Sequence, residues 1–168
     1  MKSESKMLLP KELVLVLMLF IMAPSVIRAQ TGNVNFSGSW SLNQGKSTTG
    51  GDQRMAASPT MTVTQESNKL SVTRTASNRD GGSTQNTTNF SLDGKEMVNS
   101  TQRGESKTVA AWSSDGKSLT LTTTRSFNGT DMKTVEIWTI DSSNALSIKS
   151  DVTMPQGNRS STLVYDKR

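Results

Sequence analysis

Residues 107–150 read KTVAAWSSDGKSLTLTTTRSFNGTDMKTVEIWTIDSSNALSIKS, and three turn signals divide this stretch into four consecutive strands. Asp115-Gly116 and Asn128-Gly129 each predict a two-residue hairpin loop with positive φ at both central positions, which Asp, Asn and Gly adopt at low cost. Ser142-Ser143-Asn144 predicts a three-residue loop with Asn144 in the left-handed region. These turns set the pairing of four strands in series.

Counting outward from these turns places a row of large apolar side chains across the four strands. Trp112 falls opposite Leu119, Leu119 opposite Trp138, and Trp138 opposite Ile148. Because side chains alternate between the two faces of a strand, the Thr and Lys residues between them fall on the other face. The stretch therefore predicts an antiparallel sheet with one dry face and one wet face.

The rest of the chain adds six predicted strands, at 35–43, 60–65, 69–75, 85–92, 95–100 and 160–167. The fold class is therefore all-β, an antiparallel up-and-down meander of about ten strands. In such a meander the tenth strand runs opposite to the first, so the two can pair and close a barrel. Tight turns close one end, whereas the predicted loops at 44–59, 77–83 and 101–106 cover the other.

Three further turns set pairings outside the central stretch, at Ser67-Asn68, at Asp93-Gly94 and at 154–158. The predicted partners are Met61 with Arg74, Phe90 with Met97, Ser150 with Leu163, and Ile148 with Tyr165. The outer face carries Thr, Ser, Lys and Asp, with Val135 and Ile137 as exceptions. An outer-membrane barrel needs an apolar outward band, so we expect a barrel surrounded by water.

The first 29 residues predict a signal peptide, followed by a single domain at 34–168. Lys2, Lys6 and Lys11 precede an apolar run at 13–22, and a short segment then ends at Ala29. The rival interpretation is an uncleaved anchor, but the run to Ile27 is shorter than the roughly 20 residues that a spanning helix needs. We therefore expect an exported protein, periplasmic or secreted, with no membrane contact after cleavage.

Composition excludes several classes of site. The chain has no Cys and no His, which removes disulfides, thiolate and imidazole metal sites and the Ser-His-Asp triad. We expect no metal and no cofactor. Removing the leader lowers the net charge from +5 to +3, and the remaining charges are scattered without a basic run. Nucleic-acid binding therefore has little support.

The segment FSGSWSLN, residues 36–43, resembles the first-strand Gly-x-Trp signature of the lipocalins and fatty-acid-binding proteins, in which the Trp packs across the closed base of the barrel. Together with SLDGKE, WSSDGKSLTL, EIW and LVYDK, it is similar to small exported bacterial lipocalin-like proteins. The resemblance implies a lipocalin-like barrel. The second lipocalin motif, the helix pair of fatty-acid-binding proteins and an Arg-x-Tyr on the last strand are missing, so the resemblance implies no particular ligand.

Three arginines on the inward face, Arg74, Arg125 and Arg159, fall towards the loop end with three methionines, Met61, Met132 and Met154. Guanidinium groups offer a fixed fork for a carboxylate or a phosphate, and thioethers adapt to an irregular apolar body. The hypothesis is a mouth that captures a small amphipathic anion, with its head at the arginines and its tail towards the tryptophans. The alternative is that these long side chains extend from the rim into water.

Glu136 is predicted to point inward opposite Leu121, where a carboxylate needs a partner. An arginine or an ordered water would supply one, and we favour a structural ion pair over a general acid. Four aromatic residues share the predicted barrel base: Trp40, Trp112, Trp138 and Tyr165. They form either a box that stacks on a ligand or a filled core, and a chain this poor in apolar residues favours the core.

The preferred interpretation is a non-enzymatic, monomeric binding protein for a small hydrophobic or amphipathic anionic molecule. The alternative is a structural or interaction module of the cell envelope with a filled barrel, and a carboxylate-based enzyme is a third, weaker interpretation. The internal volume separates the first two, because a ligand site needs roughly 300 Å³ or more of cavity opening at the loop end.

Overall fold

A computed structural model describes residues 32–49, 57–77, 80–101, 104–127 and 129–168, so the predicted leader lies outside the described part of the chain. Ten antiparallel strands form one sheet in the order β4-β3-β2-β1-β10-β9-β8-β7-β6-β5. The elements are β1 (Gly38–Leu42), the 3-10 helix η2 (Gln44–Lys46), β2 (Thr60–Gln65), β3 (Lys69–Ser77), β4 (Ser83–Ser91), β5 (Met97–Thr101), β6 (Gly104–Trp112), β7 (Ser118–Phe127), β8 (Thr130–Ile140), β9 (Leu146–Met154) and β10 (Gly157–Lys167).

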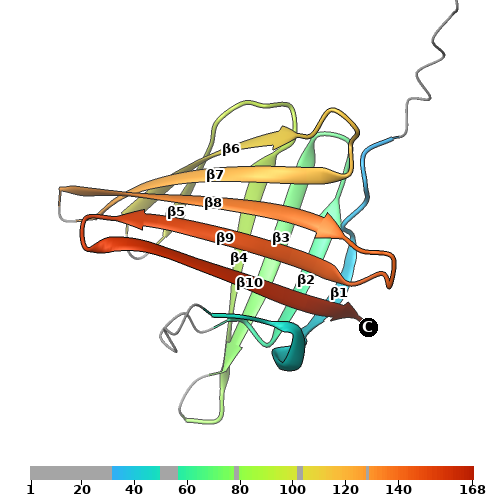
Figure 1. Ribbon diagram of the computed structural model, residues 1–168. Coiled ribbons are helices and arrows are strands. Elements are labelled where there is room, and N and C mark those ends of the chain that lie inside the picture. The colour runs from blue at the N-terminus through green and yellow to red at the C-terminus, as the bar shows by residue number, and fades with distance from the viewer. Residues whose placement is uncertain (1–31, 50–56, 78–79, 102–103, 128) are drawn as a thin grey trace, which may run out of the picture. The chain divides into compact units, whose positions relative to one another are not determined.

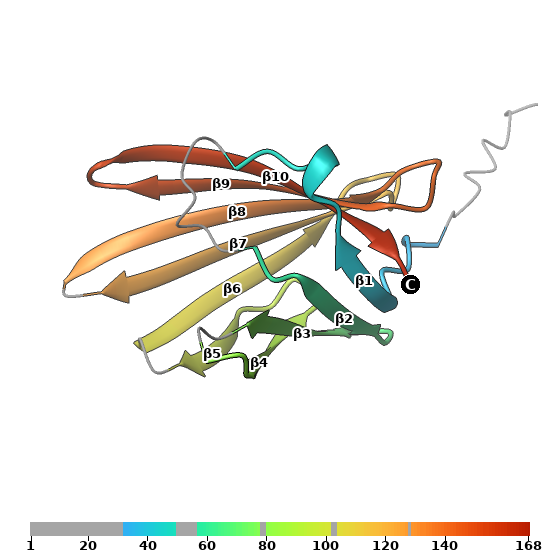
Figure 2. The same cartoon turned by 90° about the horizontal axis from the view of Figure 1, so that it is seen from below.

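The first and last strands of the sheet pair with one another, as predicted. β1 pairs with β10, with Trp40 opposite Lys167 and Leu42 opposite Tyr165. Strands β6–β10 form one wall in Figure 1, and β2–β4 cross behind them at a steep angle. Figure 2 shows β1 between these walls, beside the C-terminus. Each strand faces the interior with alternate residues, so the all-β barrel prediction is confirmed.

The register of the central hairpins is also confirmed. Trp112 pairs with Leu119, Leu119 with Trp138, and Trp138 with Ile148. Asn144 has φ 66, as the three-residue loop requires. One turn differs from the prediction, because the residues from Ser114 to Lys117 form a four-residue loop.

In that loop the Gly116 N–H donates to the Ser113 carbonyl at 2.9 Å, and the positive φ falls on Gly116 alone. The register is unchanged because both turn types place Ser113 opposite Ser118, whose carbonyl accepts from the Ser113 N–H at 2.9 Å. The predicted turn at Asn128-Gly129 falls partly outside the described residues, since Asn128 is not among them.

The pairing of β10 with β9 is shifted by two residues from the prediction. Pro155 and Gln156 form a two-residue loop between Met154 and Gly157, so Ile148 pairs with Leu163 rather than with Tyr165. The predicted turn was too long because Pro fixes its own φ at a turn position and lets the chain reverse sooner. A shift of two keeps every side chain on its predicted face.

The predicted hairpin between Phe90 and Met97 is wrong, because β4 and β5 are the two edges of the sheet. The Asp93 carboxylate accepts hydrogen bonds from the Ser91 hydroxyl and from the Lys95 N–H, so this turn is closed by its own side chain. The Leu92 N–H donates to the Asn68 carbonyl at 2.9 Å, which holds the end of β4 at the β2–β3 turn instead.

One side chain bridges the gap between the edge strands. The Asn99 amide on β5 donates to the Asn89 carbonyl at 2.9 Å, and its oxygen accepts from the Asn89 N–H at 3.1 Å. The Asn99 side chain thus replaces, at one point, the backbone hydrogen bonds that β4 and β5 do not make with each other. The barrel is nearly closed rather than fully closed.

Aromatic side chains fill the end of the barrel that carries the tight turns. Phe36 stacks on Trp112 with ring centroids 5.9 Å apart and meets Trp138 edge-on at 5.8 Å. The Trp40 Nε1 donates to the Phe36 carbonyl at 3.0 Å, and Tyr165 is also buried. This end of the barrel is a packed core of buried side chains.

Candidate functional site

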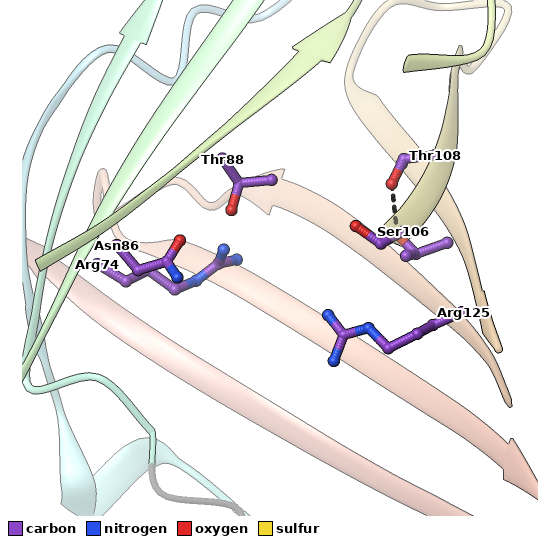
Figure 3. Close-up of a pocket in the computed structure, with 7 residues that line it drawn as sticks. Arg74, Asn86, Thr88, Ser106, Thr108 and Arg125 are labelled. Carbon is purple, nitrogen blue, oxygen red and sulfur yellow. Dashed lines mark hydrogen bonds between the residues drawn. The ribbon is translucent and has the colours of Figure 1, made fainter. Parts of the chain in front are cut away.

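An interior cavity of about 220 Å³ lies above the aromatic core, between the β3–β4 and β6–β7 walls. Its lining comprises two arginines, an amide and four hydroxyl residues: Arg74, Asn86, Thr88, Ser106, Thr108, Thr123 and Arg125. Figure 3 shows the guanidinium groups of Arg74 and Arg125 directed towards one another from opposite walls. Every side chain of this lining therefore carries a polar group, and two of them carry positive charge.

Strand alternation explains why both arginines point inward. Arg74 follows Val72, which is fully buried, by two residues on β3, and it pairs with Met61, which is buried as well. Arg125 shares the face of Leu121 on β7 and pairs with Ser106. Because the period of a strand is two, each guanidinium enters the barrel on the same face as the core residues below it.

Glu136 lies inward opposite Leu121, as predicted, and it has the arginine partner that this position requires. Its Oε2 lies 3.6 Å from an Arg74 guanidinium nitrogen and accepts the indole N–H of Trp138 at 2.9 Å. The Arg74 guanidinium also lies 5.9 Å from the centre of the Trp138 ring. These three side chains form a charge-compensated network between the core and the cavity.

Arg125 has no such compensation. Its Nε is buried and lacks a hydrogen-bond partner among the described residues, and no carboxylate belongs to the described lining of the cavity. Since Glu136 balances Arg74, the site carries about one uncompensated positive charge on Arg125. An unpaired buried donor costs free energy, and the uncompensated positive charge of Arg125 favours an anion in the cavity.

Hydroxyl groups make up most of the remaining lining, and sequence patterns missed them. The Thr108 and Thr123 hydroxyls are 2.9 Å apart across β6 and β7, and the Ser106 hydroxyl donates to the Asn99 carbonyl at 3.3 Å. Ser and Thr are frequent throughout this chain, so composition gave no signal. The hairpin register did contain one, because it places Thr108 and Thr123 on the face of Leu121.

The other predicted ligand residues are not part of the cavity lining. Arg159 is exposed on β10, and Met154 ends β9 half-buried. Met132 is half-buried opposite Arg125 but contributes no wall to the cavity. The structure thus places Arg74 and Arg125 in the cavity lining, with Glu136 in contact with Arg74, and leaves the other three predicted residues out of the lining.

Tyr165 lies beneath the network at the top of the core. Burial raises the pKa of its hydroxyl above 10.0, while the charge of Arg74 lowers it and that of Glu136 raises it. The phenol therefore stays protonated at neutral pH and remains a neutral member of the core. Among the described residues no cluster of acidic side chains suits a metal ion, and no helix has the length and apolarity to span a membrane.

No protein-family model and no curated protein matches this sequence. Among solved structures, the chain is similar to the zebrafish ileal bile acid-binding protein complexed with cholic acid, with a TM-score of 0.52 and 18% sequence identity. The match covers 79% of this chain and 98% of that one. At this identity the similarity concerns the fold alone, an all-β, nearly closed antiparallel barrel that has ten strands in this chain.

Proposed function

We propose that the protein binds a small anionic molecule inside its barrel without chemically changing it. The observation that carries this proposal is Arg125, a half-buried guanidinium with an unpartnered Nε in an interior cavity. Arg74 faces it across the same space. Two facing guanidinium groups repel each other, and an anion between them replaces that repulsion with charge-assisted hydrogen bonds.

The volume of the cavity limits the ligand. At about 220 Å³ it is smaller than the roughly 300 Å³ expected for a ligand of drug size, because the aromatic core occupies the base of the barrel. A tail directed towards the tryptophans has no space there. The anionic head therefore lies between the arginines, and any further atoms extend towards the mouth.

The structural neighbour supports an anion in a barrel of this shape, because cholic acid, its bound molecule, carries a carboxylate. Glu136 supports a binding role rather than catalysis, since Arg74 and Trp138 already engage its carboxylate. We also propose that the chain is exported through its apolar leader and acts as a monomer in the periplasm or outside the cell. Determining the N-terminus of the mature protein tests the export proposal.

The binding test compares two charge-removing variants. Arg125→Met removes the inward guanidinium, whereas Lys133→Met removes a charge from the outer face of β8, opposite the residue before Arg125. Calorimetry against a panel of small carboxylates should detect binding to the natural chain and to Lys133→Met, but not to Arg125→Met. Equal binding by all three proteins would remove the proposal.

The filled aromatic base favours a second candidate, a structural module of the cell envelope that acts through its surface. Thermal unfolding with and without the panel of small carboxylates separates the two candidates. A structural module gains no stability from any anion, whereas a binding protein unfolds at a higher temperature when its ligand is present.

A further inference from the structure

We infer that the anion is a small, hydroxylated monocarboxylate of the sugar-acid type and not a lipid, an inference that rests on the proposed function. The carrying observation is the chemistry of the wall. Every described side chain that lines the cavity carries a guanidinium, an amide or a hydroxyl, and no aliphatic or aromatic residue is among them. An acyl chain or a steroid needs apolar walls, and here such side chains lie below the cavity in the packed core.

The charge of the site selects a single negative charge on the ligand. Glu136 already compensates Arg74 at 3.6 Å, and Arg125 remains uncompensated. One carboxylate between the guanidinium groups neutralises this excess and accepts from both forks. A doubly charged phosphate group would bring a second negative charge close to Glu136, which would weaken its binding.

The hydroxyl and amide groups select the rest of the ligand. Thr108 and Thr123 bond to one another at 2.9 Å, and each hydroxyl keeps further hydrogen-bonding capacity. Thr88 and Asn86 add a hydroxyl and an amide from the opposite wall, as Figure 3 shows. Ligand hydroxyl groups satisfy these partners, whereas methylene groups would displace their water and leave them unpaired.

The size of the cavity agrees with this class. About 220 Å³ corresponds to roughly seven waters at about 30 Å³ each. A compact sugar acid carries an oxygen on nearly every carbon, so its oxygens can take the places of these waters. A long-chain fatty acid exceeds the cavity and has nothing to replace the hydrogen bonds of the water it expels.

Calorimetry with four probes tests the inference: gluconate, the neutral polyol sorbitol, decanoate and inorganic phosphate. We expect gluconate to bind, and sorbitol, decanoate and phosphate to bind at least about tenfold more weakly. Arg125→Met should weaken gluconate binding at least about tenfold, and Lys133→Met should leave it unchanged. Thr123→Val keeps the shape of the wall and removes one hydroxyl, so gluconate affinity should fall several-fold while decanoate affinity does not fall.

The outcomes separate this inference from the proposed function. If decanoate binds in an Arg125-dependent way and gluconate does not, the barrel binds anions but the ligand class is wrong. Tighter binding of phosphate than of gluconate, or equal binding of sorbitol, would also overturn the class. If no anion binds in an Arg125-dependent way, both the class and the proposed function fail.

Discussion

Glu136→Gln should lower the stability of the protein and raise its affinity for anions at the same time. The substitution keeps an oxygen that can accept the Trp138 N–H and removes only the negative charge beside Arg74. Both side chains are largely buried, with 28% of Arg74 and 24% of Glu136 exposed. Without the carboxylate, two uncompensated guanidinium groups share one cavity, which disfavours the empty fold and favours a bound anion.

The expected loss lies between two reference cases. Exposed ion pairs contribute about 0.2–1 kcal/mol, and breaking a fully buried pair costs about 3–5 kcal/mol. About one quarter of each side chain is exposed here, so we expect a loss of about 2 kcal/mol. For a domain of this size that corresponds to a fall in Tm of roughly 6–10 °C. Removing a charge that repels the ligand should strengthen gluconate binding about tenfold.

Urea denaturation followed by tryptophan fluorescence measures the stability, and calorimetry measures the affinity. The matched control is Glu96→Gln, which makes the same change in an exposed pair with Lys107 at 3.8 Å and should cost less than about 0.5 kcal/mol. A loss no larger than that of the control would show that the Arg74–Glu136 pair does not stabilise the fold. Weaker anion binding by Glu136→Gln would refute the proposed charge balance of the site.

Arg125→Met should raise the stability of the empty protein by about 1 kcal/mol, because it removes an unpartnered buried donor. Urea denaturation measures this change, and a lower stability would contradict the prediction. Asn99→Ala removes both hydrogen bonds to Asn89 and should lower the free energy of unfolding by about 1–2 kcal/mol. Hydrogen exchange of the Asn89 backbone amide should become faster. Unchanged exchange would mean that the Asn99 side chain does not hold β4 and β5 together. The Ser91 hydroxyl, followed by Lys95, lowers the pKa of Asp93 from 3.8 to about 2, so Asp93 stabilises the fold above pH 3.8 and this contribution is lost as the pH falls towards 2. Thermal unfolding at several pH values should therefore show that the difference between the natural chain and Asp93→Asn shrinks between about pH 5 and pH 2, and a constant difference would contradict the assignment.

Turn chemistry and strand alternation predicted most of the barrel. The row from Trp112 through Leu119 to Trp138 followed from where the turns are centred, because the centre of a hairpin turn fixes the register of both its strands. The same argument failed at Asp93-Gly94, where the turn is favourable by itself but the strands on either side do not pair. A turn sequence predicts that the chain reverses direction locally. Whether the two flanking strands pair also depends on the rest of the sheet, and here these strands, β4 and β5, are its two edges.

The sequence singled out the two arginines of the cavity lining and did not single out its neutral residues. The register of the hairpins places three charged residues on the inward face of the sheet, where burial of a charge is costly unless it has a partner. These residues are Arg74, Arg125 and Glu136. Thr108 and Thr123 did not stand out among many similar residues on both faces. Strand alternation places Arg159 on the inward face of β10, but it cannot predict whether other residues cover that end of the strand, and Arg159 is exposed.

The pairing of β1 with β10 has a consequence for how this protein folds. The order of the sheet places the first and last strands side by side, with the meander β1–β4 on one side and β5–β10 on the other. Each meander can assemble from contacts between neighbouring segments, but they join only when residues more than 120 positions apart meet. Such long-range closure slows folding. During synthesis β1 therefore presents an unpaired edge until β10 has been made, and that interval is when the chain is most exposed to association with other unfinished chains.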